Sequence, residues 1–344
     1  MVVPISIHTL GSKNKKSRLK LIWRSLGITV LTALVVVCVL LYFFQRFHTT
    51  ADKVVFHSKF QDQACFVPFQ LRNNLISFQA DFAGRKEDCI LDTGSPAILW
   101  PRSANLPGKR TLSWGFAKDA AGRQATVTEF ILSSIKIGSY ELQGVPTLAI
   151  SGNSSSSRSY PDLHYICDLG NAAFSQTAMT IDYKKHVLLL RNQQYDPILH
   201  CSKTCFVLPF QWKSKTPGTS KFGYLVVAAE ISGQPLNLVV DTGDSSPATA
   251  LTDSYYKAHL RQTLMRHNWV QKTAFGETKA DWLPELKVSV PDARPNAPEF
   301  VINQPAVILP DQQDGVDAVI GYAVLKDYLV TIDYPRHRIF LERN

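Results

Sequence analysis

An Asp-Thr-Gly tripeptide occurs twice in this chain of 344 residues, and each copy follows an apolar run. The first copy lies in CILDTGSPAILW, residues 89–100, and the second in LVVDTGDSSPAT, residues 238–249. One copy would be weak evidence, because Asp and Gly are common in the turns between strands. Two copies in similar surroundings indicate that the chain consists of two related halves.

The sequence around the tripeptides repeats in the same order. CFVPFQL at residues 65–71 corresponds to CFVLPFQW at residues 205–212, and TIDY occurs near the end of each half. The Asp of the tripeptide precedes a late glycine by 78 residues in the first half and by 80 in the second. A repeat of about 150 residues is too long for a solenoid. It predicts an N-terminal lobe at 64–195, a linker at 196–204 and a C-terminal lobe at 205–344.

Both halves consist mostly of apolar runs with strand character, separated at short intervals by Gly and Pro. This pattern is typical of an all-β barrel or sandwich. One short helical stretch follows the late glycine of each half, NAAFSQTA at residues 171–178 and YAVLKDYL at residues 322–329. The sequence therefore predicts an all-β fold with little helix.

The first 50 residues differ from the rest of the chain in charge. They contain seven Lys or Arg and no Asp or Glu, which leaves two of the nine net positive charges for all other residues. That remainder gives no electrostatic footprint for nucleic acid. We therefore expect no nucleic-acid partner.

An uncharged run of 19 residues, LGITVLTALVVVCVLLYFF, follows a basic segment at residues 1–25. The run is long enough to cross the hydrocarbon core, so we expect a transmembrane helix over residues 26–44. The basic flank predicts a cytoplasmic N-terminus. After a tether at residues 45–63, the rest of the chain would lie outside the cytoplasm, in a bacterial periplasm. A cleaved signal peptide is the weaker alternative, because the run exceeds a usual signal-peptide core and no small-residue cleavage site follows it.

Five of the six cysteines fall in this exported region, where disulfides persist. Cys89 lies three residues before Asp92, and Cys167 lies three residues before Gly170. The two cysteines can form a disulfide if their strands are neighbours.

The pairing of the remaining cysteines stays open at this stage. Cys65 could pair with Cys201 or Cys205, because connectivity cannot be deduced from sequence. No Cys-x-x-Cys pair and no His pair at helical spacing occurs in the sequence. We therefore expect no metal site and no cofactor.

The duplicated acids, Asp92 and Asp241, suggest a chemical role. Two carboxylates about 3 Å apart cannot both ionise comfortably, so they share one proton and supply a base and an acid together. Gly94 and Gly243 would let backbone amides approach the carboxylates. Thr93 and Thr242 can form hydrogen bonds across the junction and fix the two loops.

The motifs LDTGSPAILW and VDTGDSSPA, with the elements DLG and VIG that each precede TIDY, resemble the retropepsin-like aspartyl proteases. The resemblance covers nearly all of residues 65–344 and is to a duplicated, bilobed, pepsin-like arrangement. It implies two closed-barrel lobes related by a pseudo-twofold axis. It also implies that Asp92 and Asp241 are the catalytic pair and hold a water between them, with Gly170 and Gly321 in structural positions behind their loops.

The same resemblance implies β-hairpin flaps that would close over an extended peptide. The flaps would lie near residues 114–126 and 270–280, with Trp114, Phe116 and Phe275 as candidate flap aromatics. Packing in the core is the alternative role for each of these aromatic residues.

The two motifs differ at the residue that follows the glycine. The first has Ser95, whose hydroxyl can steady the neighbouring carboxylate, and the second has Asp244. An inward Asp244 would raise the proton affinity of the pair through like-charge repulsion. Alternatively, Asp244 faces solvent or caps a turn, and Ser245 or Ser246 supplies the hydroxyl.

Asp182 and Asp333 of the two TIDY sequences precede turns. We expect them to be hairpin or salt-bridge residues and to take no part in the chemistry.

The sequence as a whole predicts a membrane-anchored aspartic endopeptidase that hydrolyses extended peptides with a water activated between Asp92 and Asp241. Its partners would be a polypeptide substrate and, through the N-terminal helix, the membrane. The lobes pair within one chain, so we expect a monomer. The alternative is a catalytically impaired peptide-binding or regulatory envelope module that retains the aspartyl protease fold.

Overall fold

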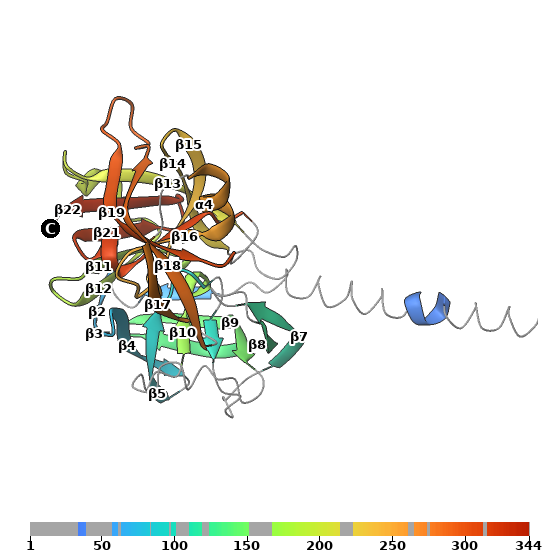
Figure 1. Cartoon of the computed structure of the whole chain (residues 1–344). Coiled ribbons are helices and arrows are strands. Elements are labelled where there is room, and N and C mark those ends of the chain that lie inside the picture. The colour runs from blue at the N-terminus through green and yellow to red at the C-terminus, as the bar shows by residue number, and fades with distance from the viewer. Residues whose placement is uncertain are drawn as a thin grey trace, which may run out of the picture. The chain divides into compact units, whose positions relative to one another are not determined.

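Strands make up most of the regular structure of this protein, which we describe from a computed structural model (Figure 1). The all-β prediction is confirmed. The residues that the structure describes are 34–38, 57–60, 63–82, 84–95, 98–100, 110–118, 124–150, 167–213, 223–260, 265–273, 276–311 and 315–343.

The N-terminal half consists mainly of strands. They are β1 (His57–Phe60), β2 (Ala64–Pro68), β3 (Gln70–Arg72), β4 (Leu75–Phe82), β5 (Arg85–Leu91), β6 (Ile98–Trp100), β7 (Arg110–Lys118), β8 (Gln124–Ile137), β9 (Tyr140–Ile150), β10 (Cys167–Leu169), β11 (Thr177–Asp182) and β12 (Val187–Asn192). The short helix α3 (Asn171–Phe174) lies within the predicted helical stretch.

The C-terminal half follows a similar order. Its strands are β13 (Phe206–Lys213), β14 (Tyr224–Ile231), β15 (Gln234–Val240), β16 (Thr249–Thr252), β17 (Met265–Thr273), β18 (Gly276–Val290), β19 (Phe300–Leu309), β20 (Ala318–Ile320), β21 (Tyr328–Asp333) and β22 (Arg338–Arg343). Helix α5 (Tyr322–Leu325) again lies within a predicted stretch, whereas α4 (Asp253–His259) was not predicted. A 3-10 helix, η1 (Pro197–His200), precedes β13 in the predicted linker.

Hydrogen bonding arranges these strands in two sheets. The nine-stranded sheet has the order β1-β9-β6-β10-β5-β4-β8-β7, with β3 paired to β4. The 13-stranded sheet has the order β17-β18-β19-β16-β20-β15-β14-β13-β22-β21-β11-β12-β2. Additional pairings join β8 to β9 and β14 to β18. The closure of each half into a barrel stays a prediction.

The two halves meet in the 13-stranded sheet, at the antiparallel pair β11 and β21 (Figure 1). Thr180 lies opposite Thr331, and these are the first residues of the two TIDY sequences. Their hydroxyls form a hydrogen bond of 2.9 Å. Outward from this pair the order is β12 then β2 on one side and β22 then β13 on the other. Corresponding strands therefore occupy corresponding places on the two sides of the junction.

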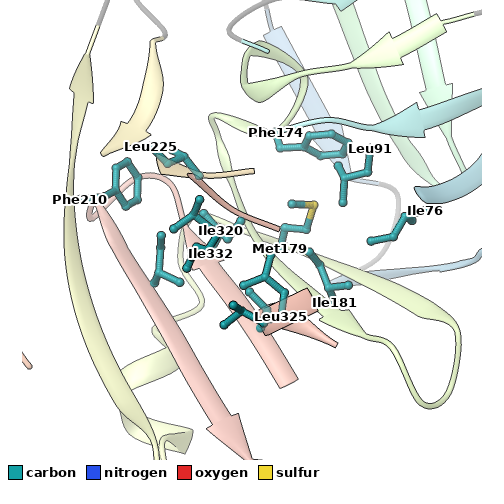
Figure 2. Close-up of a cluster of buried hydrophobic side chains, with 14 of the residues drawn as sticks. Ile76, Leu91, Phe174, Met179, Ile181, Phe210, Leu225, Ile320, Leu325 and Ile332 are labelled. Atoms are coloured by element: carbon teal, nitrogen blue, oxygen red, sulfur yellow. The ribbon is translucent and has the colours of Figure 1, made fainter. Parts of the chain in front are cut away.

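One hydrophobic core serves both halves. Figure 2 shows Leu91, Phe174 and Met179 of the N-terminal half in the same cluster as Ile320 and Ile332 of the C-terminal half. All five side chains are 0% exposed. These residues lie on strands of both halves and on the short helix α3. The shared core therefore supports both Asp-Thr-Gly loops.

The chain divides into two units, Met1–Thr50 and Ala51–Asn344, and the second contains both halves of the repeat. The tether predicted at residues 45–63 is partly a strand, because His57–Phe60 form β1 and pair with β9. The other residues of that segment, apart from 63, and the basic segment 1–25 lie outside the described residues.

The prediction of a single-pass membrane protein is contradicted. In the part of the chain that the structure describes, no helix is long and apolar enough to cross a membrane. Within the predicted span 26–44, the structure describes residues 34–38, which are helical. The predicted cytoplasmic N-terminus and periplasmic location therefore lose their basis.

Two disulfides lie in the second unit, Ala51–Asn344. Cys89 of β5 bonds to Cys167 of β10, and β5 and β10 are parallel neighbours, as this pairing required. Cys201 bonds to Cys205 across a short loop, so the suggested pairing of Cys65 with either of them is wrong. Cys65 is a buried free thiol that donates to Ile137 O and accepts from Ser139 N, both at 3.2 Å. Disulfides are typical of extracellular or secreted proteins.

Candidate active site

The two acids of the repeat follow equivalent strands. Asp92 comes directly after β5, and its backbone N–H donates to Leu169 O at 3.1 Å. Asp241 comes directly after β15, and its N–H donates to Ile320 O at 2.9 Å. Each acceptor lies on a short parallel neighbour, β10 or β20. Both acids are therefore placed by the same local structure.

Thr93 and Thr242 link the two loops through four reciprocal hydrogen bonds. The Thr93 N–H donates to Thr242 Oγ1 at 3.0 Å, and the Thr242 N–H donates to Thr93 Oγ1 at 2.9 Å. The Thr93 hydroxyl donates to Val240 O at 2.8 Å, and the Thr242 hydroxyl donates to Leu91 O at 2.9 Å. The two threonines are 0% and 1% exposed. The loops are thus fixed to each other by buried, symmetric contacts.

The glycines of the two motifs lie directly against the carboxylates. A Cβ on Gly94 would overlap the Asp241 carboxylate, and a Cβ on Gly243 would lie 2.5 Å from Asp92 Oδ1. Asp241 Oδ1 accepts from Gly94 N at 3.1 Å and from Gly243 N at 2.7 Å. The side chains of Asp92 and Asp241 also hydrogen-bond to each other. The structure therefore brings the two predicted acids together.

The surroundings of the pair favour one shared proton. Burial first, and then the negative charge of Asp241, raise the pKa of Asp92 well above its usual value. Burial also raises the pKa of Asp241, but hydrogen bonds from Gly243 N, Asp92 and Gly94 N oppose the rise. Asp241 receives more donors, so the proton is favoured on Asp92 and the negative charge on Asp241. Both acids keep partial exposure. Such a pair can donate one proton and accept another at the same time.

Ser95 and Asp244 occupy equivalent backbone positions. Their N–H groups donate to Asp92 O at 3.1 Å and to Asp241 O at 3.2 Å, respectively. Asp244 also caps a turn, because its Oδ1 accepts from Ser246 N at 3.0 Å and its Oδ2 from Ser246 Oγ at 2.9 Å. Burial and the charge of Asp241 raise the pKa of Asp244 to about 7. Asp244 therefore caps a turn, as one of the two alternatives expected, and an effect of its charge on the pair stays a prediction.

The late glycines lie behind the loops. A Cβ on Gly321 would lie 2.6 Å from Asp244 Cβ and 2.8 Å from Asp241 O, which leaves no room for a side chain. Gly170 occupies the corresponding place before α3. The residue after each glycine anchors its loop, because Asn171 N donates to Ser95 O at 2.9 Å and Tyr322 N donates to Asp244 O at 3.0 Å.

Two contacts that the sequence did not predict cross between the halves behind the acids. Tyr334 donates its hydroxyl to Asn171 Oδ1 at 3.0 Å, and Asn171 Nδ2 donates to Thr93 O at 2.7 Å. The equivalent pair, Tyr183 and Tyr322, meets edge to face with ring centroids 5.9 Å apart. The signal for both was present, because each pair joins the Tyr of one TIDY to the residue after the late glycine of the other half.

Asp168 is a further acid near the pair that the sequence analysis did not select. Burial and the charge of Asp241 raise the pKa of Asp168 to about 7. Its signal was the unusual Asp in the element DLG, where the second half has the apolar VIG.

The predicted flap regions form hairpins. β7 and β8 pair from Arg110 to Lys118, and β17 and β18 pair as far as Thr273 opposite Gly276. Trp114 and Phe116 lie on β7, where the structure describes the backbone but not these side chains. Phe275 lies outside the described residues.

Asp182 and Asp333 serve as turn and ion-pair residues, as predicted. Asp182 accepts from Lys185 N at 2.9 Å and from Lys185 Nζ at 3.0 Å. Asp333 pairs with Arg336 at 3.3 Å and with Arg338 at 2.8 Å. Among the residues that the structure describes, no group of His, Cys, Asp and Glu could hold a metal ion.

Comparisons with known proteins add little to this geometry. No family model matches the chain, and no curated protein matches it. Among solved structures, the chain is similar to the one titled "Crystal structure of Basic 7S globulin from soybean". The TM-score is 0.48 at 11% sequence identity, over 81% of this chain and 95% of that chain.

Proposed function

We propose that this protein is an aspartic endopeptidase of the retropepsin-like type, in which Asp92 and Asp241 activate a water molecule. The observation that supports the proposal is the hydrogen-bonded pair of carboxylates, supplied by two equivalent loops that Thr93 and Thr242 lock together. One chain supplies both acids, so the active form would be a monomer. The two halves would then be lobes related by a pseudo-twofold axis.

The reaction uses the unequal surroundings of the two acids. Asp241, held in its charged form by the Gly94 and Gly243 amides, takes a proton from the water as its oxygen attacks the peptide carbonyl carbon. Asp92 gives its proton to the carbonyl oxygen, which forms a tetrahedral gem-diol. On collapse, the proton on Asp241 passes to the amide nitrogen, the C–N bond breaks, and a hydroxyl of the gem-diol returns a proton to Asp92.

The substrate would be a peptide in extended conformation. Extended peptides bind by main-chain pairing along exposed strands, with alternate side chains entering pockets. The hairpins β7–β8 and β17–β18 are the candidate strands for this pairing. Trp114, Phe116 and Phe275 stay candidates for contacts with the substrate.

A second candidate function is peptide binding without cleavage. Two further partly buried acids near the pair, Asp168 and Asp244, favour it. Like charges raise the proton affinity of the pair, and a pair that holds two protons cannot activate water.

Cleavage of a random peptide pool by the full chain tests the proposal. Mass spectrometry of the products should map cuts at a limited set of sequences, and an inhibitor with a tetrahedral hydroxyl-bearing carbon should prevent them. Retention of peptides on the immobilised chain without any cut would favour the second candidate. Cuts that persist at full inhibitor occupancy would contradict the proposed chemistry.

A further inference from the structure

Asp168 lies at the centre of β10, on the opposite face from the core. Its neighbours Cys167 and Leu169 are 0% exposed and belong to the shared hydrophobic cluster. Successive side chains of a strand point to opposite faces, so Asp168 faces away from that cluster. Its register partners are Ile90 of β5 and Leu99 of β6.

The equivalent position in the C-terminal half is apolar. Val319 of β20 lies opposite Val239 of β15 and Ala250 of β16, in the same register as Asp168. These three residues belong to a second hydrophobic cluster that also includes Val226, with Trp269 and Trp282 packed against it.

The N-terminal half therefore carries polar groups where the C-terminal half carries valines. Ser77, opposite Ile90 on β4, corresponds to Val226, and Asp168 corresponds to Val319. The backbone pairing is the same in both halves. The difference lies in what each surface can bind, because the valine surface accepts only apolar groups and the other offers a carboxylate.

One oxygen of the Asp168 carboxylate, Oδ1, lacks a hydrogen-bond partner within the described part of the chain. This atom is buried, although the residue as a whole keeps partial exposure. A buried polar group without a partner is costly, and such groups are uncommon in folded proteins. The charge of Asp168 also raises the pKa of Asp92, so the carboxylate lies within electrostatic reach of the catalytic pair.

We propose that Asp168 forms an anionic subsite beside Asp92 and Asp241 that binds a cationic side chain, lysine or arginine, of the substrate next to the cleaved bond. The inference rests on the proposed peptidase function and names its substrate class. An ionised carboxylate only accepts hydrogen bonds, and Lys and Arg side chains are donors that carry the opposite charge. A bound cation also offsets the like charges of Asp92, Asp241 and Asp244.

The test compares three peptides that differ at one residue next to a mapped cleavage site: lysine, norleucine or glutamine. For the full wild-type chain at pH 7.5, kcat/KM for the lysine peptide should exceed that for the norleucine peptide at least about tenfold. In Asp168→Asn and in Asp168→Val, which installs the residue of the other half, the ratio should fall to about one. Asp327→Asn, which removes an exposed acid of the C-terminal half, should keep the wild-type ratio.

Binding of a non-cleavable analogue gives a readout that does not depend on turnover. Analogues with a reduced peptide bond and either lysine or norleucine are titrated into each variant by calorimetry. Tighter binding of the lysine analogue by about tenfold, lost in both Asp168 variants, supports the subsite even if no peptide is cut. Equal affinity of the wild type for both analogues, or binding of neither, overturns it. Equal cleavage of the lysine and norleucine peptides overturns the subsite and leaves the peptidase in place.

Discussion

The two halves share a backbone framework around the acids and differ in the side chains that fill it. Leu169 O and Ile320 O accept equivalent hydrogen bonds, and Thr93 and Thr242 exchange equivalent ones. The residues placed on this framework are not equivalent, because Ser95 corresponds to Asp244 and Asp168 to Val319. The shared backbone hydrogen bonds therefore determine where the two acids meet. The side chains that differ between the halves determine the charge and the polarity around the acids.

The disulfide between Cys89 and Cys167 is a difference in how the two halves are stabilised. Cys89 and Cys167 occupy the positions of Leu238 and Ala318, which pair in the same register. The double change Cys89→Leu with Cys167→Ala replaces the disulfide with the two residues that occupy the equivalent positions in the C-terminal half. The free energy of unfolding should fall by about 4 kcal/mol, because the bond closes a long loop of the unfolded chain.

Urea unfolding under non-reducing conditions measures this loss. Cys201→Ser with Cys205→Ser is the matched control, since that bond joins residues only four apart, and it should cost about 2 kcal/mol. If the control loses more unfolding free energy than the Cys89 and Cys167 variant, the expected dependence on the length of the closed loop is contradicted.

Substitution of the two threonines tests whether their equivalent hydrogen bonds contribute equally to stability. Thr93→Val and Thr242→Val each remove a hydroxyl that donates to a carbonyl and accepts from an amide across the junction. Each should lower the free energy of unfolding by about 2–4 kcal/mol, because buried groups lose their partners. The two losses should agree within about 0.5 kcal/mol.

Denaturant titration of both valine variants and of Thr93→Ser and Thr242→Ser provides the measurement. The serine variants keep the hydroxyl and should lose less than the valine variants. If the losses of unfolding free energy in the two valine variants differ by more than about 1.5 kcal/mol, the two threonines do not contribute equally.

The tyrosine pairs should respond unequally to the same change. Tyr334→Phe removes the donor to the buried Asn171 Oδ1 and should cost about 1–3 kcal/mol of unfolding free energy. Tyr183→Phe keeps the ring that contacts Tyr322 and should cost less than about 1 kcal/mol. Thermal unfolding of both variants at one pH compares them, and equal costs would show that the hydrogen bond contributes little.

The smallest expected effect is a change in the pH profile of cleavage. Asp244 and Asp241 repel each other when both are charged, so Asp244→Ser makes it easier for the pair to lose its proton. The alkaline limb of kcat/KM should therefore move to lower pH, by about half a pH unit or more. Ser95→Asp adds an acid to the other half and should move it to higher pH. The same direction in both variants would contradict this electrostatic comparison.

Much of this structure was predictable from the repeat, because the sequence features that recur in both halves form equivalent strands and loops. The similar spacings from Asp92 to Gly170 and from Asp241 to Gly321, 78 and 80 residues, predicted two related halves, and the resemblance to a known family implied that the two acids meet. The contact between Tyr334 and Asn171 was missed, because it joins residues 163 apart and its signal lies only in the comparison of the two halves.

Local pattern was also insufficient elsewhere. Asp168 was missed because a single polar residue in a three-residue strand does not reveal which face it occupies. The apolar run at residues 26–44 predicted a membrane span from length and composition, and no helix of that length is found in the described part of the chain.

The most direct test of the shared-proton pair compares kcat/KM for Asp92→Asn, Asp241→Asn and the double variant on one mapped peptide, with Asp327→Asn as the control. Each single change should reduce kcat/KM by at least about 1,000-fold, and the double change should reduce it little further, because the acids act as one unit. A single variant that stays within about tenfold of wild type, or a double loss equal to the product of two partial single losses, would contradict the account.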